Sequence, residues 1–376
     1  MSRPPRDPVD DYRPEAVAAR HRWLNLDLPR LSGAPPSFED ARGRVEGLIG
    51  FLAVPVGIAA PLRLRGEVVG DYRVPFATTE GTMVASYQRG FKLAEAAGGV
   101  EVKVTREGLT VWPTLAYETL AEADRVRRLI LDAPGPLIAL AEATTRHGRV
   151  LSLHAELLGT RVVVALTMYT GDAQGINMVT RAAEALLRGL PPARQTLIHG
   201  LDAEKRASTA HARGRSVTAA LLVPGSLLTQ QLGVGSAALA ELWATYQLGF
   251  ARMGTANHAL QIANGLAAMY LATGQDVAYV AESAVGSLSL EDRGGDLLAT
   301  LDLPSLHVGT VGGGTGVGTA AECLRILGVQ GARELAAVFA GALLCGDLNL
   351  AASFLVGRFM DAHDRLGSPG RRTPPG

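Results

Sequence analysis

The second half of the chain is dominated by alanine, leucine and glycine, and it contains three long helical patterns. These patterns cover residues 237–251, 258–273 and 334–360. Because small residues lie on several faces of each pattern, the helices should pack closely and be largely buried. Such helices require a large core. A chain of 376 residues with 47% hydrophobic residues can form one, and its length suggests two or three domains.

A smaller unit is predicted between residues 113 and 198. Its patterns are helical at 118–132, 137–145 and 176–190, and strand-like at 150–157 and 161–168. Two antiparallel strands with helices in so short a segment indicate a small α+β domain. We therefore expect an α+β protein in which this domain is inserted into a large helix-rich domain. The large domain would comprise residues 39–112 and 199–350 around the long central helix at 258–273.

The two ends of the chain have a different composition. Residues 1–38 are rich in proline, arginine and aspartate, and they are expected to form a mobile lead-in with one short docking element. Residues 351–376 end in a glycine- and proline-rich run and are expected to form a flap followed by a frayed tail.

Charge, cysteine content and hydropathy exclude several classes of protein. The net charge is zero with no long run of like charge, so neither nucleic acid nor a membrane surface is an expected partner. The two cysteines, Cys323 and Cys345, cannot build a disulfide framework or a metal cluster, which fits a reducing cytoplasm. Each long apolar stretch is broken by proline or polar residues, and the first residues lack a signal-peptide core. We expect a soluble cytoplasmic protein without a metal.

Five stretches of the chain carry polar residues that the packing of their apolar surroundings does not require. Glu80 lies between an extended run and a predicted helix, where a carboxylate can line a cleft. The glycine-containing turn at 170–178 leads into a helix and suits a phosphate, although it lacks the G-x-G-x-x-G spacing. Asp276 follows a predicted helix, at the end where the macrodipole disfavours an acid. The charge run at 202–207 and the glycine-rich run at 309–316 complete the set. Each also has a simpler explanation: a capping acid, a plain turn, a solvated face or a flexible loop.

Together, these stretches resemble the 3-hydroxy-3-methylglutaryl-CoA (HMG-CoA) reductase family from about residue 46 to residue 363. Seven motifs occur in the family's order. They are similar to its dimerisation segment (46–50, followed by 54–62), catalytic-glutamate motif (77–81), nicotinamide-binding turn (171–178), acid-Lys-Lys motif (204–206), catalytic-aspartate motif (272–276), glycine motif (309–315), and the GDLNLAA run (346–352) that precedes the catalytic histidine.

The resemblance implies reduction of a CoA thioester to a primary alcohol by two successive hydride transfers. Lys205 would stabilise the developing oxyanion, and Asp276 would lie against Lys205 and Glu80. Glu80 would deliver a proton to the aldehyde oxygen, and Asn264 would orient the acid pair. His363 would protonate the departing CoA thiolate, arriving on a flap that closes over the substrate.

The resemblance also implies the remaining ligands and the assembly. The cofactor would be NADPH rather than NADH, because the nicotinamide turn is of the eukaryotic and archaeal type. The small domain would be ferredoxin-like, and the protein would be an obligate homodimer with its active sites between subunits. The implied cofactor contacts are Arg146, Asp172, Gly175, Asn177, Gly312 and Gly313, and the implied substrate contacts are Ser86, Arg89, His199, Glu204 and Arg206.

Several positions depart from the family pattern and leave alternatives open. The arginine that holds the HMG carboxylate corresponds to Val111, and a serine that helps to hold the same end corresponds to His199. Gln88 and Arg206 replace an asparagine and a second lysine. Loss of a bidentate carboxylate clamp is not conservative. Either His199 or Arg206 compensates and the substrate is HMG-CoA, or the enzyme reduces another acyl thioester against Val111 and Trp112. A non-catalytic relative that binds CoA or a partner is the third possibility, although it would not need Glu80, Lys205, Asp276 and His363 together.

Overall fold

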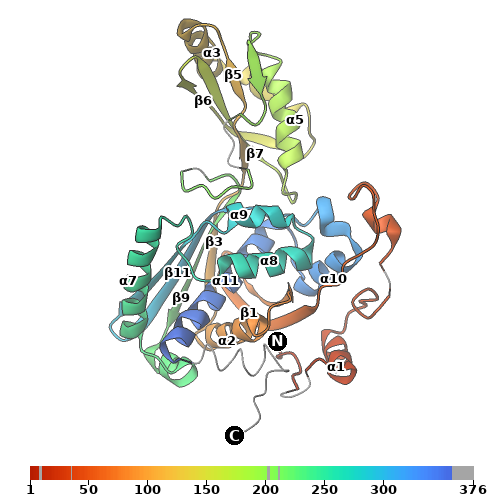
Figure 1. Ribbon diagram of the computed structural model, residues 1–376, viewed down its shortest axis with the longest axis vertical. Helices are drawn as coiled ribbons and strands as arrows, with labels where there is room; N and C mark the ends of the chain where they lie inside the picture. Colours follow the sequence, from red (N-terminus) through yellow and green to blue (C-terminus); the bar gives the residue numbers. More distant parts are fainter. Residues whose placement is uncertain (8–10, 35, 201–203, 211, 358–376) are drawn as a thin grey trace.

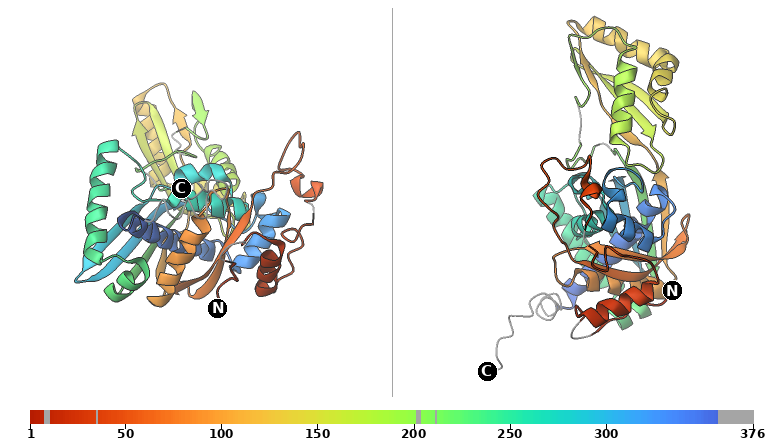
Figure 2. Two further views of the ribbon diagram at one scale, coloured as in Figure 1. Left: turned by 60° about the horizontal axis from the view of Figure 1, so that its bottom comes forward. Right: turned by 90° about the vertical axis from the view of Figure 1, so that its right-hand side faces the viewer.

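The computed structural model describes residues 1–7, 11–34, 36–200, 204–210 and 212–357. The fold is mixed α+β, with two separate sheets that each have their own helices and hydrophobic core. Figure 1 shows the larger part at the bottom and the smaller part projecting from it at the top, and Figure 2 shows the same arrangement from two other directions.

The larger part contains a six-stranded sheet in the order β10-β11-β9-β3-β1-β2. Buried and more exposed residues alternate along β3, β9 and β11, so one face of the sheet packs against the helices. The strands are β1 (Val56–Gly66), β2 (Gly70–Ala77), β3 (Val100–Arg106), β9 (Arg215–Val223), β10 (Ser287–Arg293) and β11 (Asp296–Leu306).

The helix α11 (Ala332–Leu355) crosses the middle of the larger part and is buried along almost its whole length. Its close approach to α2 depends on Gly90, because a Cβ there would lie 2.1 Å from the carbonyl oxygen of Cys345. The other helices are α2 (Met83–Ala96), α6 (Gly225–Leu227), α7 (Ser236–Met253), α8 (Ile262–Thr273), α9 (Val280–Ser283) and α10 (Gly318–Leu327), with short turns η1 (Phe38–Ala41), η2 (Leu228–Leu232), η3 (Val277–Tyr279) and η4 (Gly313–Gly316).

Two details of the predicted helices differ from the structure. The helix predicted from residue 258 begins at Ile262, because His258 instead exchanges backbone hydrogen bonds with Gly286 and Leu288. The long central helix is α11 rather than α8. By length and composition α11 resembles a membrane span, but 94% of its most apolar window is buried in the protein, as expected for a core helix.

The smaller part is built on a sheet in the order β4-β7-β5-β8, with β6 also paired to β7. From β5 onward its elements follow a β-α-β-β-α-β order, with one extra helix in the first crossover. The bounds are β4 (Leu109–Val111), β5 (Thr114–Ala116), α3 (Leu120–Asp132), α4 (Pro134–Glu142), β6 (Arg149–Leu158), β7 (Arg161–Tyr169), α5 (Ile176–Leu187) and β8 (Gln195–Leu197).

The N-terminal segment contains the helix α1 (Pro14–Leu24) and docks on α10. Leu24 and Leu28 pack against Ile326. The N–H groups of Arg30 and Leu31 donate to the Glu322 carboxylate, at 2.9 and 2.8 Å. Part of the lead-in that was expected to be mobile is therefore held by both apolar and polar contacts.

A buried carboxylate, Asp347, lies on α11 beneath the start of α8. Its oxygens accept the N–H groups of Leu260 and Gln261, at 3.0 and 2.9 Å. Burial raises the pKa of Asp347 to about 6 from the ordinary 3.8, although these two hydrogen bonds act in the opposite direction. At a pH between these two pKa values, Asp347 keeps its proton in the folded chain and has lost it in the unfolded chain. The stability contributed by this proton is complete below pH 4 and is lost as the pH rises to about 6.

We expect Asp347→Asn to abolish this part of the pH dependence, because the amide does not titrate. The free energy of unfolding of the wild type, relative to that of the variant, should fall by roughly 2 kcal/mol between pH 4.5 and pH 7. Urea denaturation of both proteins at several pH values measures this difference, in which the other titrating groups cancel. A difference that does not change with pH would contradict the assignment to Asp347.

Candidate active site

Two of the predicted catalytic residues, Glu80 and Asn264, line one cavity of about 340 Å³. Glu80 precedes α2 and Asn264 lies in the first turn of α8. Both side chains are exposed. Glu80 does not cap α2, since Thr82 occupies the N-cap position. Two predicted substrate contacts, Ser86 and Arg89, line the same cavity.

The other predicted catalytic pair, Lys205 and Asp276, is in direct contact. Lys205 Nζ lies 2.9 Å from Asp276 Oδ2 and 5.1 Å from the centre of the Tyr279 ring. Gly274 ends α8 in the left-handed conformation, and Asp276 begins the next turn, where it accepts the N–H of Ala278 at 3.0 Å. Asp276 therefore follows the C-terminal end of α8, as predicted, and it is also the N-cap of η3, which is a local structural role for an acid at this position.

The two pairs lie toward opposite ends of α8. About 14 Å of helix separates Asn264 from Thr273, at 1.5 Å per residue, and Asp276 follows Thr273. Among the described residues, the Glu80 carboxylate makes no ion pair with Lys205 and no hydrogen bond with Asp276. The contact between Lys205 and Asp276 expected from the sequence is present, whereas the expected contact of Asp276 with Glu80 is not present within one chain.

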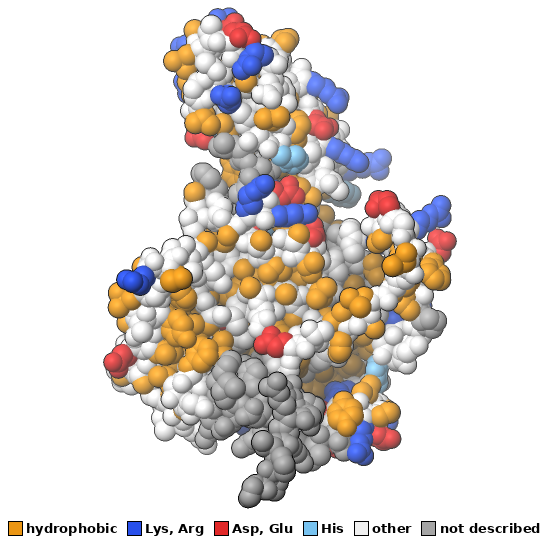
Figure 3. Space-filling model, in the orientation of Figure 1, with side chains coloured by type: hydrophobic (Ala, Val, Ile, Leu, Met, Phe, Trp, Pro, Cys, Tyr) orange, Lys and Arg blue, Asp and Glu red, His pale blue; other side chains and the backbone are white. Residues whose placement is uncertain are grey.

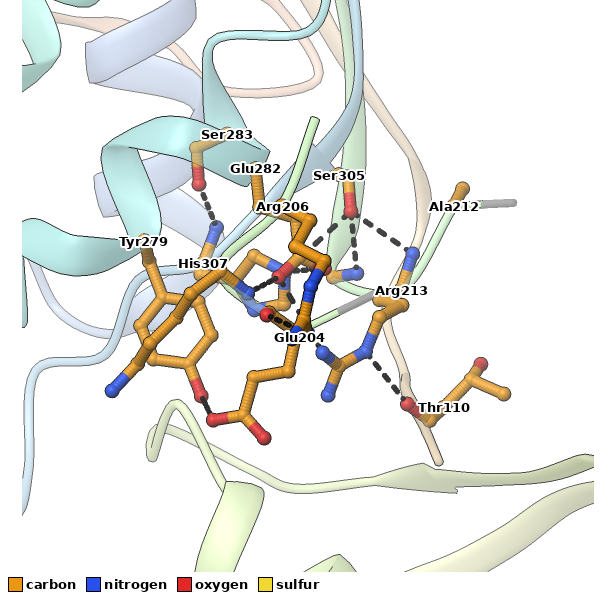
Figure 4. A network of polar contacts seen from close by, with 12 residues as sticks. Thr110, Glu204, Arg206, Ala212, Arg213, Tyr279, Glu282, Ser283, Ser305 and His307 are labelled. Carbon is orange, nitrogen blue, oxygen red and sulfur yellow. Dashed lines mark hydrogen bonds and ion pairs between the residues drawn. The ribbon is translucent and has the colours of Figure 1, made fainter. Parts of the chain in front are cut away.

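Figure 4 shows a buried polar network, which accepts the N–H of Lys205. Its centre is Glu282, which is 3% exposed and accepts the N–H of Lys205 at 3.1 Å. His307 Nε2 lies 2.8 Å from the other carboxylate oxygen, and Arg213 Nη1 lies 3.5 Å from the oxygen that Lys205 contacts. Burial lowers the pKa of His307, so the imidazole is neutral near pH 7. Figure 3 shows basic and acidic side chains gathered where the smaller part joins the larger one.

The segment 204–206 is anchored to this network by Glu204. Its Oε1 accepts the hydroxyl of Tyr279 at 2.5 Å, and its backbone carbonyl accepts Arg206 Nη1 at 3.1 Å. His199 Nδ1 lies 3.9 Å from Glu204 Oε2. Arg206 and His199 thus lie beside Glu204, and Glu204 and Lys205 contact Tyr279.

The predicted nicotinamide turn and the glycine motif lie side by side. The carbonyl of Asp172 accepts the N–H of Thr310 at 2.8 Å, and Ala173 pairs with Val311. A Cβ on Gly309 would lie 2.6 Å from the nitrogen of Gln174, so this close approach requires glycine. The Asp172 side chain accepts the N–H of Ala332 at 2.9 Å and thereby fixes the turn on the start of α11.

The same segments have features that suit an anionic dinucleotide. The Gly175 N-cap of α5 has no side-chain acceptor, and Gln174 Oε1 accepts the N–H of Ile176 at 3.1 Å. The next backbone donors at this helix start remain for an anion, and Asn177 is exposed in the first turn. Gly312 and Gly313 have positive φ angles of 81° and 55°, with open space where a Cβ would lie. Arg146 is exposed in the loop that follows α4.

The positions that depart from the family pattern have structural explanations. Val111 is fully buried in the core of the smaller sheet, which argues against the alternative in which it packs against an acyl group. Trp112 is 8% exposed and lies beneath the guanidinium of Arg213, at 5.9 Å. The Gln88 amide exchanges two hydrogen bonds with the backbone of Ala60, beside the register shift in β1. His363 lies outside the described residues.

Sequence reasoning missed the residues that support Lys205, namely Arg213, Tyr279, Glu282 and His307. One signal was present, since Glu282 and His307 are polar residues among apolar and small neighbours. Their residue numbers are too far apart for any local pattern to pair them, so only the packing of α9 against β11 reveals the cluster.

Three comparisons with known proteins, each covering most of the chain, find the same family. A model of the hydroxymethylglutaryl-coenzyme A reductase family matches residues 16–368. The 3-hydroxy-3-methylglutaryl-coenzyme A reductase of Methanothermobacter thermautotrophicus is 36% identical, covering 96% of this chain and 94% of the relative. The enzyme of the same name from Aeropyrum pernix is also 36% identical, covering 92% of this chain and 89% of the relative. A structure of the class II reductase of Streptococcus pneumoniae bound to NADPH aligns with a TM-score of 0.75 at 22% identity, covering 92% of this chain and 97% of that one.

Proposed function

Because this chain belongs to the hydroxymethylglutaryl-coenzyme A reductase family, we propose that it reduces HMG-CoA to mevalonate and free CoA with two molecules of NADPH. The observation that carries the proposal is the 2.9 Å ion pair between Lys205 and Asp276, in a segment that retains the family's acid and lysine. Such an ammonium group can stabilise an oxyanion that develops on a carbonyl.

The proposed reaction has two reductive steps. NADPH, when bound, supplies one hydride to the thioester carbon and a second to the aldehyde carbon. Lys205 stabilises the oxyanion in both steps. Between them the carbon–sulfur bond breaks, and His363 gives a proton to the CoA thiolate. Glu80 gives a proton to the oxygen of the aldehyde as the alcohol forms. Two protons are consumed in total, and two NADP⁺ leave.

The residues of the smaller part and the glycine motif are proposed to hold the cofactor. The start of α5, with Gly175 and Asn177, and the open backbone at Gly312 and Gly313 would bind its phosphates. Asp172 would act mainly by fixing the turn on α11. Arg146 would pair with the phosphate that distinguishes NADPH from NADH. The β-α-β-β-α-β order supports a ferredoxin-like domain over residues 113–198.

The two ends of the substrate are proposed to bind different elements. Ser86 and Arg89, in the cavity beside Glu80, would contact CoA. The HMG carboxylate would lie near His199 and Arg206, which are exposed beside Lys205. Because Val111 is buried in its own sheet, we assign the clamp to these two residues and not to the family's arginine position.

We propose that a second copy of the chain completes each site. One chain holds Glu80 with Asn264, and Lys205 with Asp276, toward opposite ends of α8. For Glu80 to reach Lys205, the pair of Lys205 and Asp276 must therefore come from another subunit. The segment 45–56 supports such an interface because it exposes Ile49 and Leu52 almost completely. Apolar side chains also cover the face that carries α7 and α8 (Figure 3). The homodimer is assigned to the cytoplasm on the composition of the chain.

The proposed activity is tested by following NADPH oxidation by absorbance with purified protein and HMG-CoA. Butyryl-CoA and isovaleryl-CoA, which lack the terminal carboxylate, serve as matched substrates. We expect oxidation of two NADPH per HMG-CoA and at least a hundredfold lower kcat/KM with the uncharged thioesters, because the polar groups that the bound substrate covers are then left without a partner. Oxidation only with the uncharged thioesters would overturn the substrate assignment. Absence of oxidation with all three would overturn the catalytic one.

A further inference from the structure

We propose that Glu282 is a positioning residue for the catalytic lysine, and that His307 holds its carboxylate in place. This inference rests on the proposed role of Lys205. Glu282 lies in the short helix α9, and His307 follows β11. The pair therefore joins two elements of the larger part, behind the segment 204–206 (Figure 4).

The first supporting observation concerns the main chain of Lys205. Its φ angle is 57°, in the left-handed region, where a residue with a Cβ is disfavoured. In the described chain only Asn25 and Thr82 share this feature among residues other than glycine. Such a conformation persists when surrounding contacts impose it. Glu282 supplies one of these contacts by accepting the Lys205 N–H at 3.1 Å.

The second observation is that the Glu282 carboxylate is itself fixed. It is almost completely buried, between His307 Nε2 at 2.8 Å and Arg213 Nη1 at 3.5 Å. His307 Nδ1 faces the side-chain amide nitrogen of Gln174 at 3.3 Å and accepts its hydrogen. In the neutral imidazole the proton then lies on Nε2, whose distance from Glu282 Oε1 is 2.8 Å. A charged acceptor shielded from water gives the Lys205 N–H a strong partner.

The third observation is that the same cluster supports the segment from its other side. The Tyr279 ring stacks on His307, with centres 4.7 Å apart and planes at 30°. Its hydroxyl donates to Glu204 at 2.5 Å, and Lys205 Nζ lies over its face at 5.1 Å. Two neighbouring groups thus hold consecutive residues of the segment 204–206. Glu282 holds the main chain of Lys205, and Tyr279 holds the side chain of Glu204.

The consequence for the reaction follows from geometry. The Lys205 side chain is exposed and flexible, so its direction toward Asp276 depends on where its main chain is held. A displacement on the order of 1 Å at a catalytic group lowers the rate by about a hundredfold. Glu282 is buried and contacts the main chain of Lys205, so it is proposed to act on the reaction only through Lys205. The link from His307 to Gln174 also ties the lysine to the proposed cofactor turn.

The test uses His307 variants, because they leave the buried pair of Glu282 and Arg213 intact. His307→Phe keeps a ring to stack on Tyr279 but removes the nitrogen that lies against Glu282, whereas His307→Gln restores an N–H near the position of Nε2. Hydrogen exchange of peptides that cover residues 204–207 reports the Lys205 N–H directly, whether or not the protein is active. We expect this exchange to accelerate at least tenfold in His307→Phe and to return toward the wild-type rate in His307→Gln.

Kinetics of the same variants separate positioning from general damage. In His307→Phe, kcat for HMG-CoA should fall roughly tenfold to a hundredfold, with KM and the Kd of NADPH each changed less than threefold. Glu282→Gln should behave in the same way if it folds. Glu291→Gln, which removes an exposed carboxylate on β10, is the matched control and should match the wild type.

Two results would overturn the inference: unchanged Lys205 exchange in His307→Phe, or no recovery in His307→Gln. Either result in a wild type that reduces HMG-CoA rejects the positioning role alone. A wild type that fails to reduce HMG-CoA rejects the proposed function, and the exchange data then still decide whether the pair holds the Lys205 main chain.

Discussion

Replacement of Lys205 with alanine should lower kcat for HMG-CoA reduction by about a hundred- to a thousandfold, the usual effect of removing one group that stabilises an oxyanion. The binding of NADPH should change little, because Lys205 lies with Asp276 and Tyr279 and not at the start of α5. Stability should also be kept, since the ion pair is half-exposed and exposed pairs contribute little. Absorbance kinetics, NADPH fluorescence and thermal unfolding measure these three quantities.

The chain provides well-matched controls for this experiment. It has only three lysines, and the other two, Lys92 and Lys103, are exposed outside the proposed site. Lys103→Ala should retain wild-type kcat. Lys205→Arg keeps the positive charge but replaces a compact ammonium with a planar fork, so we expect it to recover only part of the activity. Full activity in Lys205→Ala would contradict the assignment of the oxyanion-stabilising group.

Mixing two inactive variants should restore activity if each site is shared between subunits. Glu80→Gln removes the proposed proton donor, and Asp276→Asn removes the partner of Lys205, so each homodimer should lose about a hundredfold or more in kcat. A mixed dimer has both substitutions in one site and neither in the other. After unfolding and refolding of an equal mixture, half of the dimers are mixed, so about a quarter of the wild-type activity should return.

The contrast between shared and unshared sites makes this experiment decisive. If Glu80 and Asp276 of one chain formed the same site, every site in a mixed dimer would carry one substitution and no activity would return. Refolding each variant alone gives the baseline, and refolding the wild type gives the yield. Size-exclusion chromatography of the refolded mixture reports whether dimers form, so a failure of assembly is distinguished from a failure to complement.

Local pattern was sufficient for much of the fold. The strands predicted at 150–157 and 161–168 correspond to β6 and β7, and the helix predicted from residue 176 is α5. Alternation and helical periodicity are properties of adjacent residues, so the sequence displays them directly. The start of α8 was placed four residues too early because His258 forms backbone hydrogen bonds with residues near 287. No local pattern contains that information.

The same division applies to the candidate site. The order and spacing of the motifs identified Glu80, Lys205 and Asp276 and the family to which the chain belongs, because chemical function requires particular side chains at particular points of the chain. Only the tertiary structure could bring Lys205 to Asp276 and separate both from Glu80, since these distances depend on how α8 lies between distant segments.

The sequence by itself determined the α+β class, most of the elements and the chemistry, which reside in neighbouring residues. Tertiary structure alone decided that Val111 is a core residue, that Asp276 caps η3, and that Glu282 and His307 lie behind Lys205. Burial and electrostatic partnership are properties of the surroundings of a side chain. Residues that are far apart in the chain supply those surroundings only after it has folded.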